Sequence, residues 1–294
     1  MAHLKHKKIS VFNIVIFVVL ILYTLFLVAL MLWGALTSMK TLNDFYLHKF
    51  GLPEQWTVSN YTEVLEKFSL KVTINGSQGL IDIWGQAGNT LLYAVGCGLS
   101  TAIACCIVSY LSAKFDFALS KIVYTIVLVA MVIPIIGSTP AYLAFMKKTQ
   151  LYDTWIGVYL SNFSFLGMYF LVFHGVFSGI SPEYSEAATI DGANEYQIFF
   201  KIMIPLVMPT FYTIFLIYFI NFWNDYTTAL LYMPDHPTLA YGVYYLSMLS
   251  SEPEMSFIPR KMAACVILAL PLTILFVAFR NKIMGNVTMG GVKE

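Results

Sequence analysis

An uncharged, apolar run from Ile9 to Leu36 limits the fold of this chain more than any other feature of its sequence. As an α-helix rising about 1.5 Å per residue, the run would extend roughly 42 Å, beyond the ~30 Å hydrocarbon core of a bilayer. It is too long for the apolar region of a secretory signal, and no small-residue cleavage site follows it. The sequence therefore predicts a retained first transmembrane helix that tilts or projects from the membrane.

Further apolar windows follow along the chain. Hydrophobic residues make up 59% of the 294 residues and charged residues 11%, and the mean hydropathy of +0.73 exceeds what a soluble surface allows. The expected fold is all-α, a polytopic membrane protein with six transmembrane helices in one domain at residues 11–283, between tails at residues 1–10 and 284–294. The windows of spanning length lie at residues 11–39, 88–113, 119–146, 155–180, 205–233 and 262–279.

Positive charge predicts the orientation of these helices. Six helices place both termini on one side, and the segments on that side carry nine Lys and Arg residues against eight on the other, in fewer residues. We therefore expect an N-in, C-in topology, with outer segments at residues 40–86, 147–153 and 234–261. In the first of these, Asn60 to Leu65 predicts a short capped helix.

Kinks are expected where prolines fall within the windows, at Pro134, Pro140, Pro205, Pro209 and Pro271.

Charge and motif content exclude several other functions. A net charge of +1 offers no basic surface for nucleic acid. The sequence contains neither the Gly-x-x-x-x-Gly-Lys-(Ser/Thr) motif for ATP nor a His-Glu-x-x-His or Asp-x-x-Asp motif for metal-assisted catalysis. We expect no catalytic residue, no metal and no cofactor on this chain. Four cysteines lie in apolar stretches without a Cys-x-x-Cys spacing and are interpreted as packing residues, at Cys97, Cys105, Cys106 and Cys265.

A polar segment at residues 181–204 interrupts the apolar pattern on the expected inner side. Ser181 as cap and Pro182 at the first helical position predict a short helix that runs to about Ile190. Gly192 can adopt the left-handed conformation that ends such a helix, and Asn194 can cap a second one. The segment is therefore predicted to form a helix, a sharp turn and a second helix at the inner membrane surface.

The same segment carries side chains suited to docking on a protein. Its four acids, Glu183, Glu186, Asp191 and Glu195, would be repelled by anionic lipid, which disfavours the alternative of an amphipathic loop resting on headgroups. We expect Ala187 and Ala188 to provide a flat helix face for close packing. Aromatic anchors for a groove in the partner are expected at Tyr196, Phe199 and Phe200.

The spacing of Glu186-Ala187-Ala188, Gly192 and Ile202-Met203-Ile204-Pro205 resembles the coupling loop of permeases in ATP-binding-cassette (ABC) importers. The likeness continues in other segments and is nearest to carbohydrate permeases of the maltose-permease type, which have the type I fold. Those segments are Asn60-Tyr61, Asn89-Thr90-Leu91, Trp223-Asn224-Asp225-Tyr226 and Gly285 to Lys293. The resemblance implies that Glu186 to Gly192, with Asp191, sits in a cleft of an ATPase subunit. It also implies ATPase contacts for a C-terminal stretch, Gly290, Gly291, Val292 and Lys293.

The resemblance further implies a set of partners in the cytoplasmic membrane of a prokaryote. These are a homologous but different permease, two ATPase subunits that bind ATP-Mg, an extracytoplasmic sugar-binding protein, and membrane lipid. The cargo implied is a di- or oligosaccharide; a polyol, glycerol phosphate or a longer glycan is the alternative. An ion-coupled secondary transporter is a more distant alternative, disfavoured because inverted repeats are not evident in the sequence. A membrane-embedded transferase is another, disfavoured by the missing catalytic motifs.

Polar side chains late in the fifth window form a candidate substrate pathway, at Asn221, Trp223, Asn224 and Asp225. An Asp at the centre of a membrane helix costs ~2.5–3.5 kcal/mol and usually faces a pathway or a partner. Sugar hydroxyls need amide and carboxylate partners, and a sugar ring can lie against an aromatic plane. The alternative is that Asp225 lies near the outer interface and caps or pairs locally. His174, in the fourth window, is interpreted as a hydrogen-bonded interior residue rather than a proton relay.

Overall fold

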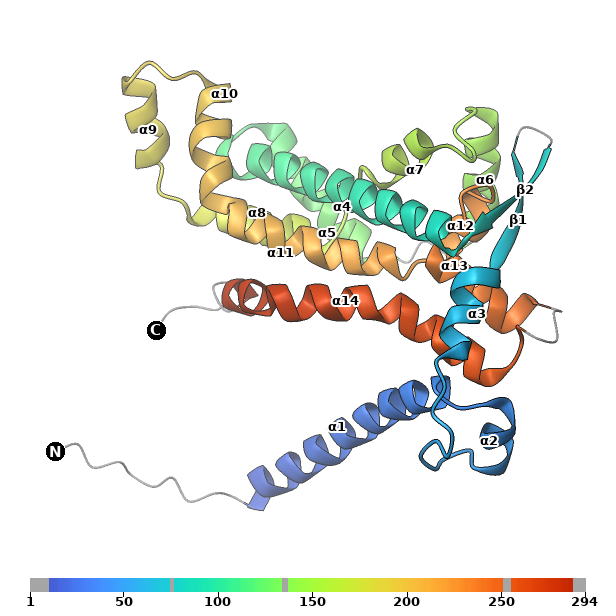
Figure 1. The fold of residues 1–294 in the computed structure, drawn as a ribbon. Helices are drawn as coiled ribbons and strands as arrows, with labels where there is room; N and C mark the ends of the chain where they lie inside the picture. The colour runs from blue at the N-terminus through green and yellow to red at the C-terminus, as the bar shows by residue number, and fades with distance from the viewer. Residues whose placement is uncertain (1–10, 75–76, 134–136, 251–254, 288–294) are drawn as a thin grey trace. The chain divides into compact units, whose positions relative to one another are not determined.

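The computed structural model describes residues 11–74, 77–133, 137–250 and 255–287, which divide into two compact units (Figure 1). The first unit combines the chain up to Phe68 with Leu246–Ala269. The second combines Ser69–Tyr245 with the residues from Leu270 onward. The helix α14 (Ile258–Val287) passes from one unit to the other.

The first unit contains the long N-terminal helix predicted from the uncharged run. α1 (Val11–Ser38) has no buried residue in its most apolar window, so almost its whole surface is left for lipid or another protein. Two short helices follow, α2 (Leu42–Leu47) and α3 (Ser59–Lys67). The short helix expected around Asn60 is confirmed, but Asn60 does not cap it. Its amide instead donates to the carbonyls of Ser38 and Lys40, at 2.9 and 2.8 Å, and so fixes the chain that leaves α1.

The second unit opens with a β-hairpin, which corrects the all-α expectation to a mostly helical fold. β1 (Ser69–Ile74) pairs antiparallel with β2 (Ser77–Asp82), in a register that places Ser69 opposite Asp82. The hairpin leads directly into α4 (Ile83–Lys114), because the Asp82 carboxylate accepts the Gly85 amide at 2.9 Å and caps the helix.

α4 is the centre of the second unit. It packs along α11 (Ile204–Trp223), α8 (Met168–Gly179) and α7 (Trp155–Asn162). Small buried side chains on α4 permit this close approach, among them Ala102, Ala104 and Cys105. The ring of Tyr159 occupies the space that any side chain at Gly96 would need.

Two apolar windows expected as single spans are each divided into two helices. Residues 119–146 form α5 (Ala118–Val132) and α6 (Thr139–Lys148), and residues 155–180 form α7 and α8. Pro140 lies in the first turn of α6, where its missing N–H has no intrahelical partner to lose. Within the described residues, four helical stretches are long and apolar enough to cross a membrane: Val11–Ser38, Ile83–Lys114, Glu195–Trp223 and Ile258–Phe279.

The remaining elements of the second unit lie near the two ends of the α4–α11 pair (Figure 1). At one end are α9 (Glu183–Ile190) and α10 (Glu195–Ile198), and a π-helical turn, η1 (Phe199–Met203), connects α10 to α11. At the other end are the hairpin, α12 (Thr227–Tyr232) and α13 (Leu239–Tyr244). A second π-helical turn, η2 (Tyr245–Leu249), follows α13, and from Leu246 onward it belongs to the first unit.

Candidate functional site

The segment Ser181–Ile204, called the elbow from here on, begins with the predicted short helix. The helix starts at Glu183, one residue later than expected, and Pro182 precedes it. The Ser181 hydroxyl accepts the Glu183 amide at 3.3 Å, and Glu183 and Glu186 occupy the first turn. Acids in that turn are favoured because the helix dipole is positive there.

Gly192 ends α9 as predicted, in a complete Schellman motif. Its φ of +83° is in the left-handed region, where a residue with a Cβ is strained. The Gly192 amide donates to the Thr189 carbonyl at 3.0 Å, and the Ala193 amide donates to the Ala188 carbonyl at 2.9 Å. Ala188 and Ala193 also belong to the same apolar cluster, which supplies the hydrophobic contact typical of this motif. The sharp turn is therefore fixed by backbone hydrogen bonds and packing together.

The second arm of the elbow, which consists of α10 and η1 (residues 195–203), differs from the expectation. Asn194 and Gln197 form the predicted cap as a reciprocal capping box, each side chain accepting the other residue's amide at 3.0 Å. The helix then continues through η1 into α11 instead of ending at the membrane surface. In η1 the Ile204 amide bonds to the Phe199 carbonyl. The wider turn immediately precedes Pro205, whose ring lacks the N–H that a regular helix uses.

The elbow has a buried face and an exposed face. Ala188 is 7% exposed and Ile198 2%, and both join the core of the second unit. Phe199 is partly buried, with its ring 4.6 Å from that of Tyr110 on α4. Of the expected docking residues, Ala188 and Phe199 therefore hold the elbow to the bundle. The other expected docking residues, all exposed, are Glu186, Ala187, Asp191, Gly192, Tyr196 and Phe200.

Two exposed apolar residues on α9 were not singled out from the sequence. Ile190 is 85% exposed and Tyr184 54% exposed, and Tyr196 on the second arm is 78% exposed. An exposed Ile next to a helix end gives no periodic signal in the sequence, because the helix is only two turns long. With the acids, these side chains make a mixed surface that is both apolar and negative, and such a mixture suits a protein partner better than an anionic bilayer.

Residues at the C-terminal end of α4 contact the elbow and the chain that leads into it. Lys114 donates its ammonium to the Ile180 carbonyl at 2.7 Å, directly before the elbow begins. Tyr110 contacts the rings of both Phe177 and Phe199, so it joins α8 to the second arm. A cavity of ≈ 420 Å³ lies between these supports and the acidic face, with Glu186 and Glu195 in its lining.

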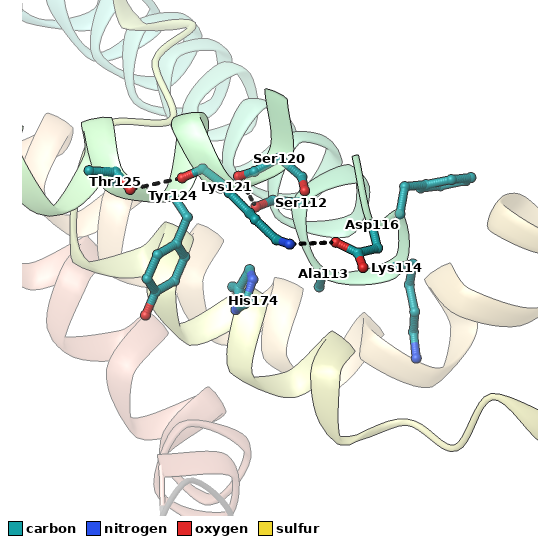
Figure 2. Close-up of a pocket in the computed structure, with 10 residues that line it drawn as sticks. Ser112, Ala113, Lys114, Asp116, Ser120, Lys121, Tyr124, Thr125 and His174 are labelled. Atoms are coloured by element: carbon teal, nitrogen blue, oxygen red, sulfur yellow. Dashed lines mark hydrogen bonds and ion pairs between the residues drawn. The ribbon is translucent and has the colours of Figure 1, made fainter. Parts of the chain in front are cut away.

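A second cavity, of ≈ 430 Å³, lies between the end of α4, the start of α5, and α8 (Figure 2). Lys121 pairs with Asp116 at 3.1 Å, and the Ser112 hydroxyl donates to the Ser120 carbonyl at 3.1 Å. His174 faces the ring of Tyr124, with 4.8 Å between centroids. The first two contacts hold the α4–α5 turn, and the third joins α5 to α8. His174, interpreted from the sequence as a hydrogen-bonded interior residue, is half-buried in the lining of this cavity.

The candidate substrate-pathway residues are only partly available to a ligand. Asp225 accepts from the Tyr93 hydroxyl at 2.7 Å and the Thr228 hydroxyl at 2.6 Å, and from the amides of Thr227 and Thr228. It therefore caps α12 and ties it to α4, which is the local role kept open as the alternative. Trp223 is buried at 6% exposure. Asn221 and Asn224 are exposed, and Asn224 donates to the Ile220 carbonyl at 2.9 Å.

Other predicted residues take the following places. The cysteines are free thiols, with Cys97, Cys105 and Cys106 buried, consistent with packing. The expected C-terminal contacts, Gly290, Gly291, Val292 and Lys293, lie outside the described residues, as do residues 1–10 of the N-terminal tail and Pro134.

Comparison with known proteins decides the family. The model of the family described as "Binding-protein-dependent transport system inner membrane component" matches residues 106–283, which include the whole elbow. The chain belongs to this family. It is a permease component of an ABC importer, not a catalytic subunit, and a multi-pass protein of the bacterial inner membrane.

Its relatives are carbohydrate importer permeases. The chain is 22% identical to the diacetylchitobiose uptake system permease protein of Streptomyces coelicolor, over 92% of this chain and 86% of that protein. It is 26% identical to the melibiose/raffinose/stachyose import permease protein of Bacillus subtilis, over 87% and 88% of the two chains. A chain in the crystal structure of a bacterial ABC transporter that imports the acidic polysaccharide alginate matches with a TM-score of 0.78 and 22% identity, covering 95% and 99%. The permease therefore has an ABC importer permease fold.

Proposed function

We propose that this permease moves a di- or oligosaccharide across the cytoplasmic membrane and is driven by separate ATPase subunits through the elbow. The observation that carries the proposal is the exposed acidic and aromatic face of the elbow, held on a buried face by Ala188, Ile198 and Phe199. A segment that only capped the bundle would not need a rigid turn beneath such a surface.

The proposed arrangement in the membrane is the type I permease fold with N-in, C-in topology. Six crossings are counted if α5 with α6, and α7 with α8, each make one broken crossing beside the four long helical stretches. Broken helices are tolerated at membrane depth where neighbouring helices or cavity water satisfy the freed backbone groups. The membrane domain then covers residues 11–283, with the elbow and both tails, residues 1–10 and 284–294, in the cytoplasm.

The partners proposed are a homologous second permease, two ATPase subunits that bind ATP-Mg, an extracytoplasmic sugar-binding protein, and lipid. Closure of the ATPases around ATP would move the elbow, and the continuous helix from α10 to α11 would pass this movement into the membrane. ATP and the binding protein can shift the conformation only by their different affinities for its states. The C-terminal Gly290 to Lys293 is proposed to contact the ATPases as well.

Adjacent alanines on α9 provide a matched test of docking. Ala187 is exposed, whereas Ala188 is buried against the core. We expect Ala187→Cys in the assembled transporter to form cross-links to an ATPase subunit with a short bifunctional thiol reagent. Ala188→Cys should form none, and the buried native thiols Cys97, Cys105 and Cys106 should add little background. Absence of cross-links from Ala187→Cys and from a second exposed site, Tyr196→Cys, would falsify the docking role.

The cargo class rests on the relatives, which import diacetylchitobiose and melibiose, raffinose or stachyose. We expect proteoliposomes of the complete transporter, with its binding protein, to take up a labelled di- or oligosaccharide and to hydrolyse ATP in proportion. Competition by a panel of unlabelled compounds separates the cargo classes. Stronger competition by a polyol, glycerol phosphate or a long glycan would replace the oligosaccharide proposal while leaving the importer mechanism intact.

A further inference from the structure

The loop that follows α2 in the first unit brings together three side chains able to bind a metal. Asp44 lies on α2, His48 follows its last residue, and Glu54 lies farther along the loop. One ligand atom from each lies within 4.8 Å of the others. The cluster belongs to the first unit, so it is separate from the elbow of the second.

The distances between these atoms suit a shared cation. His48 Nδ1 lies 3.2 Å from Glu54 Oε1 and 3.7 Å from Asp44 Oδ1. A tetrahedral ion with bonds of about 2.1 Å places its ligand atoms ~3.4 Å apart, which falls between these two values. The His48 nitrogen is therefore already placed to share an ion with either carboxylate, and the two carboxylates lie within 4.8 Å of each other.

Asp44 supplies independent evidence for a ligand at this point. Its side chain is only 5% exposed, and its Oδ2 accepts the Glu54 amide at 2.9 Å. Its other oxygen, Oδ1, is buried without a hydrogen-bond partner among the described residues, and this is the oxygen that faces the His48 ring. A buried carboxylate oxygen without a partner is costly, so an unfilled position here points to a bound cation.

The backbone around the cluster is already held in place. The Thr41 hydroxyl accepts the Asp44 amide at 3.2 Å, and the His48 amide donates to the Asp44 carbonyl at 2.8 Å. The buried Lys40 donates its ammonium to the His48 carbonyl. Lys40 lies just before α2, and its positive charge offsets part of the negative charge of the two carboxylates.

We propose that Asp44, His48 and Glu54 form a structural site for a divalent transition-metal ion, with Zn²⁺ as the reference ion. One imidazole nitrogen and two carboxylate oxygens suit Zn²⁺ or its neighbours, with water completing the coordination. Ca²⁺ and Mg²⁺ prefer oxygen ligands alone and are disfavoured. His48 and Glu54 are 48% and 64% exposed, so an ion can enter from solution. The metal would tie the end of α2 to the loop at Glu54.

Metal content of the purified transporter tests this site directly. The complex, carrying no histidine tag, is stripped with EDTA, equilibrated with Zn²⁺, passed through a desalting column and analysed by mass spectrometry. His48→Gln and Glu54→Gln remove ligands from exposed positions and should leave the fold intact. His236→Gln is the matched control, because His236 also pairs with a carboxylate, Asp153 at 3.2 Å, but among the residues described no third ligand atom lies within 4.8 Å of both.

We expect the wild-type chain and His236→Gln to retain one more Zn²⁺ per chain than His48→Gln or Glu54→Gln. Loss of one ligand should weaken the affinity at least ~100-fold, since loss of even an outer-shell partner weakens it 10- to 100-fold. Zn²⁺ should also raise the thermal unfolding midpoint only in the two proteins that bind it. Equal zinc content in all four proteins, or none in any, would show that these side chains form an ion-pair network only.

Discussion

The two ends of the second unit use acidic side chains in opposite ways. At the elbow, Glu183, Glu186, Asp191 and Glu195 are all exposed, and none makes an ion pair within the described part of the chain. At the other end, each acid accepts from protein donors: Asp225 from Tyr93 and Thr228, Asp153 from the Asp235 amide, and Asp235 from the Thr73 amide. Acids with protein partners hold the fold, whereas acids without them are available to another molecule.

Replacement of Asp225 gives the largest expected effect on stability. Replacing it with Ala leaves the Tyr93 and Thr228 hydroxyls and two backbone amides without their acceptor. We expect a loss of about 2–4 kcal/mol in unfolding free energy, measured by thermal unfolding of the solubilised protein. Asn221→Ala, at an exposed position in the last turn of α11, should change it little. Equal stability of both variants would contradict the structural role of Asp225.

Substitution of Ala187 or Ala188 on α9 gives the next largest expected effect on stability. Leu at buried position 188 must displace the core side chains around it, whereas Leu at exposed position 187 need not. We expect Ala188→Leu to lose about 1–3 kcal/mol of stability. Ala187→Leu should keep the fold but impair ATPase docking, which co-purification of the ATPase measures. If the two variants show the reverse pattern, the assignment of the two elbow faces is wrong.

Substitutions at Gly192 test the effect of backbone geometry apart from that of side-chain size. A Cβ at this position meets no atom within 4 Å, so a substitution acts only through the backbone. We expect Gly192→Val to cost about 1–2 kcal/mol locally and to lower the ratio of sugar imported to ATP hydrolysed. Gly192→Asn should retain most of this ratio, because Asn tolerates the left-handed conformation. Identical ratios for Val and Asn would mean that the turn does not govern coupling.

The smallest effect concerns Asp153, in the loop before α7. Burial raises the pKa of its carboxyl, and the neighbouring Asp235 adds to this, while the hydrogen bond with His236 opposes it. Because the folded state then holds the proton more tightly, this group's contribution to stability is present at low pH and is lost as pH rises through the folded pKa. Relative to Asp153→Asn, the wild type should lose less than about 1 kcal/mol between pH 4 and 7. Unfolding midpoints measured across that range test the sign.

The sequence predicted those features that depend on local pattern. The uncharged run predicted α1, and Gly192 and Asn194 predicted the turn and cap of the elbow because their side-chain chemistry alone favours those conformations. The hairpin β1–β2 could have been predicted as well. The dipeptide Asn75-Gly76 between alternating residues strongly favours a two-residue hairpin turn, although the hydropathy pattern predicts only an outer segment at residues 40–86.

Other features depend on tertiary contacts that a single sequence does not contain. Ala187 and Ala188 are identical in type, yet only the second is buried, because the orientation of α9 on Tyr110 and Phe177 decides which face turns inward. The carboxylate of Asp225 could equally have lined a sugar pathway. Its partner Tyr93 is far away in the sequence, and only folding brings the two together.

The continuous helical stretch from Glu195 to Trp223, which includes the π-helical turn η1, has a mechanical consequence. Its 29 residues extend about 43 Å, and in the proposed N-in, C-in topology it would act as a lever with its short arm in the cytoplasm. A tilt of roughly 10° about one end would carry the opposite end some ~7 Å sideways, given that length. Angstrom-scale displacement on the far side of the bilayer thus requires only a modest rotation at the elbow, and it needs no flexible joint along the way.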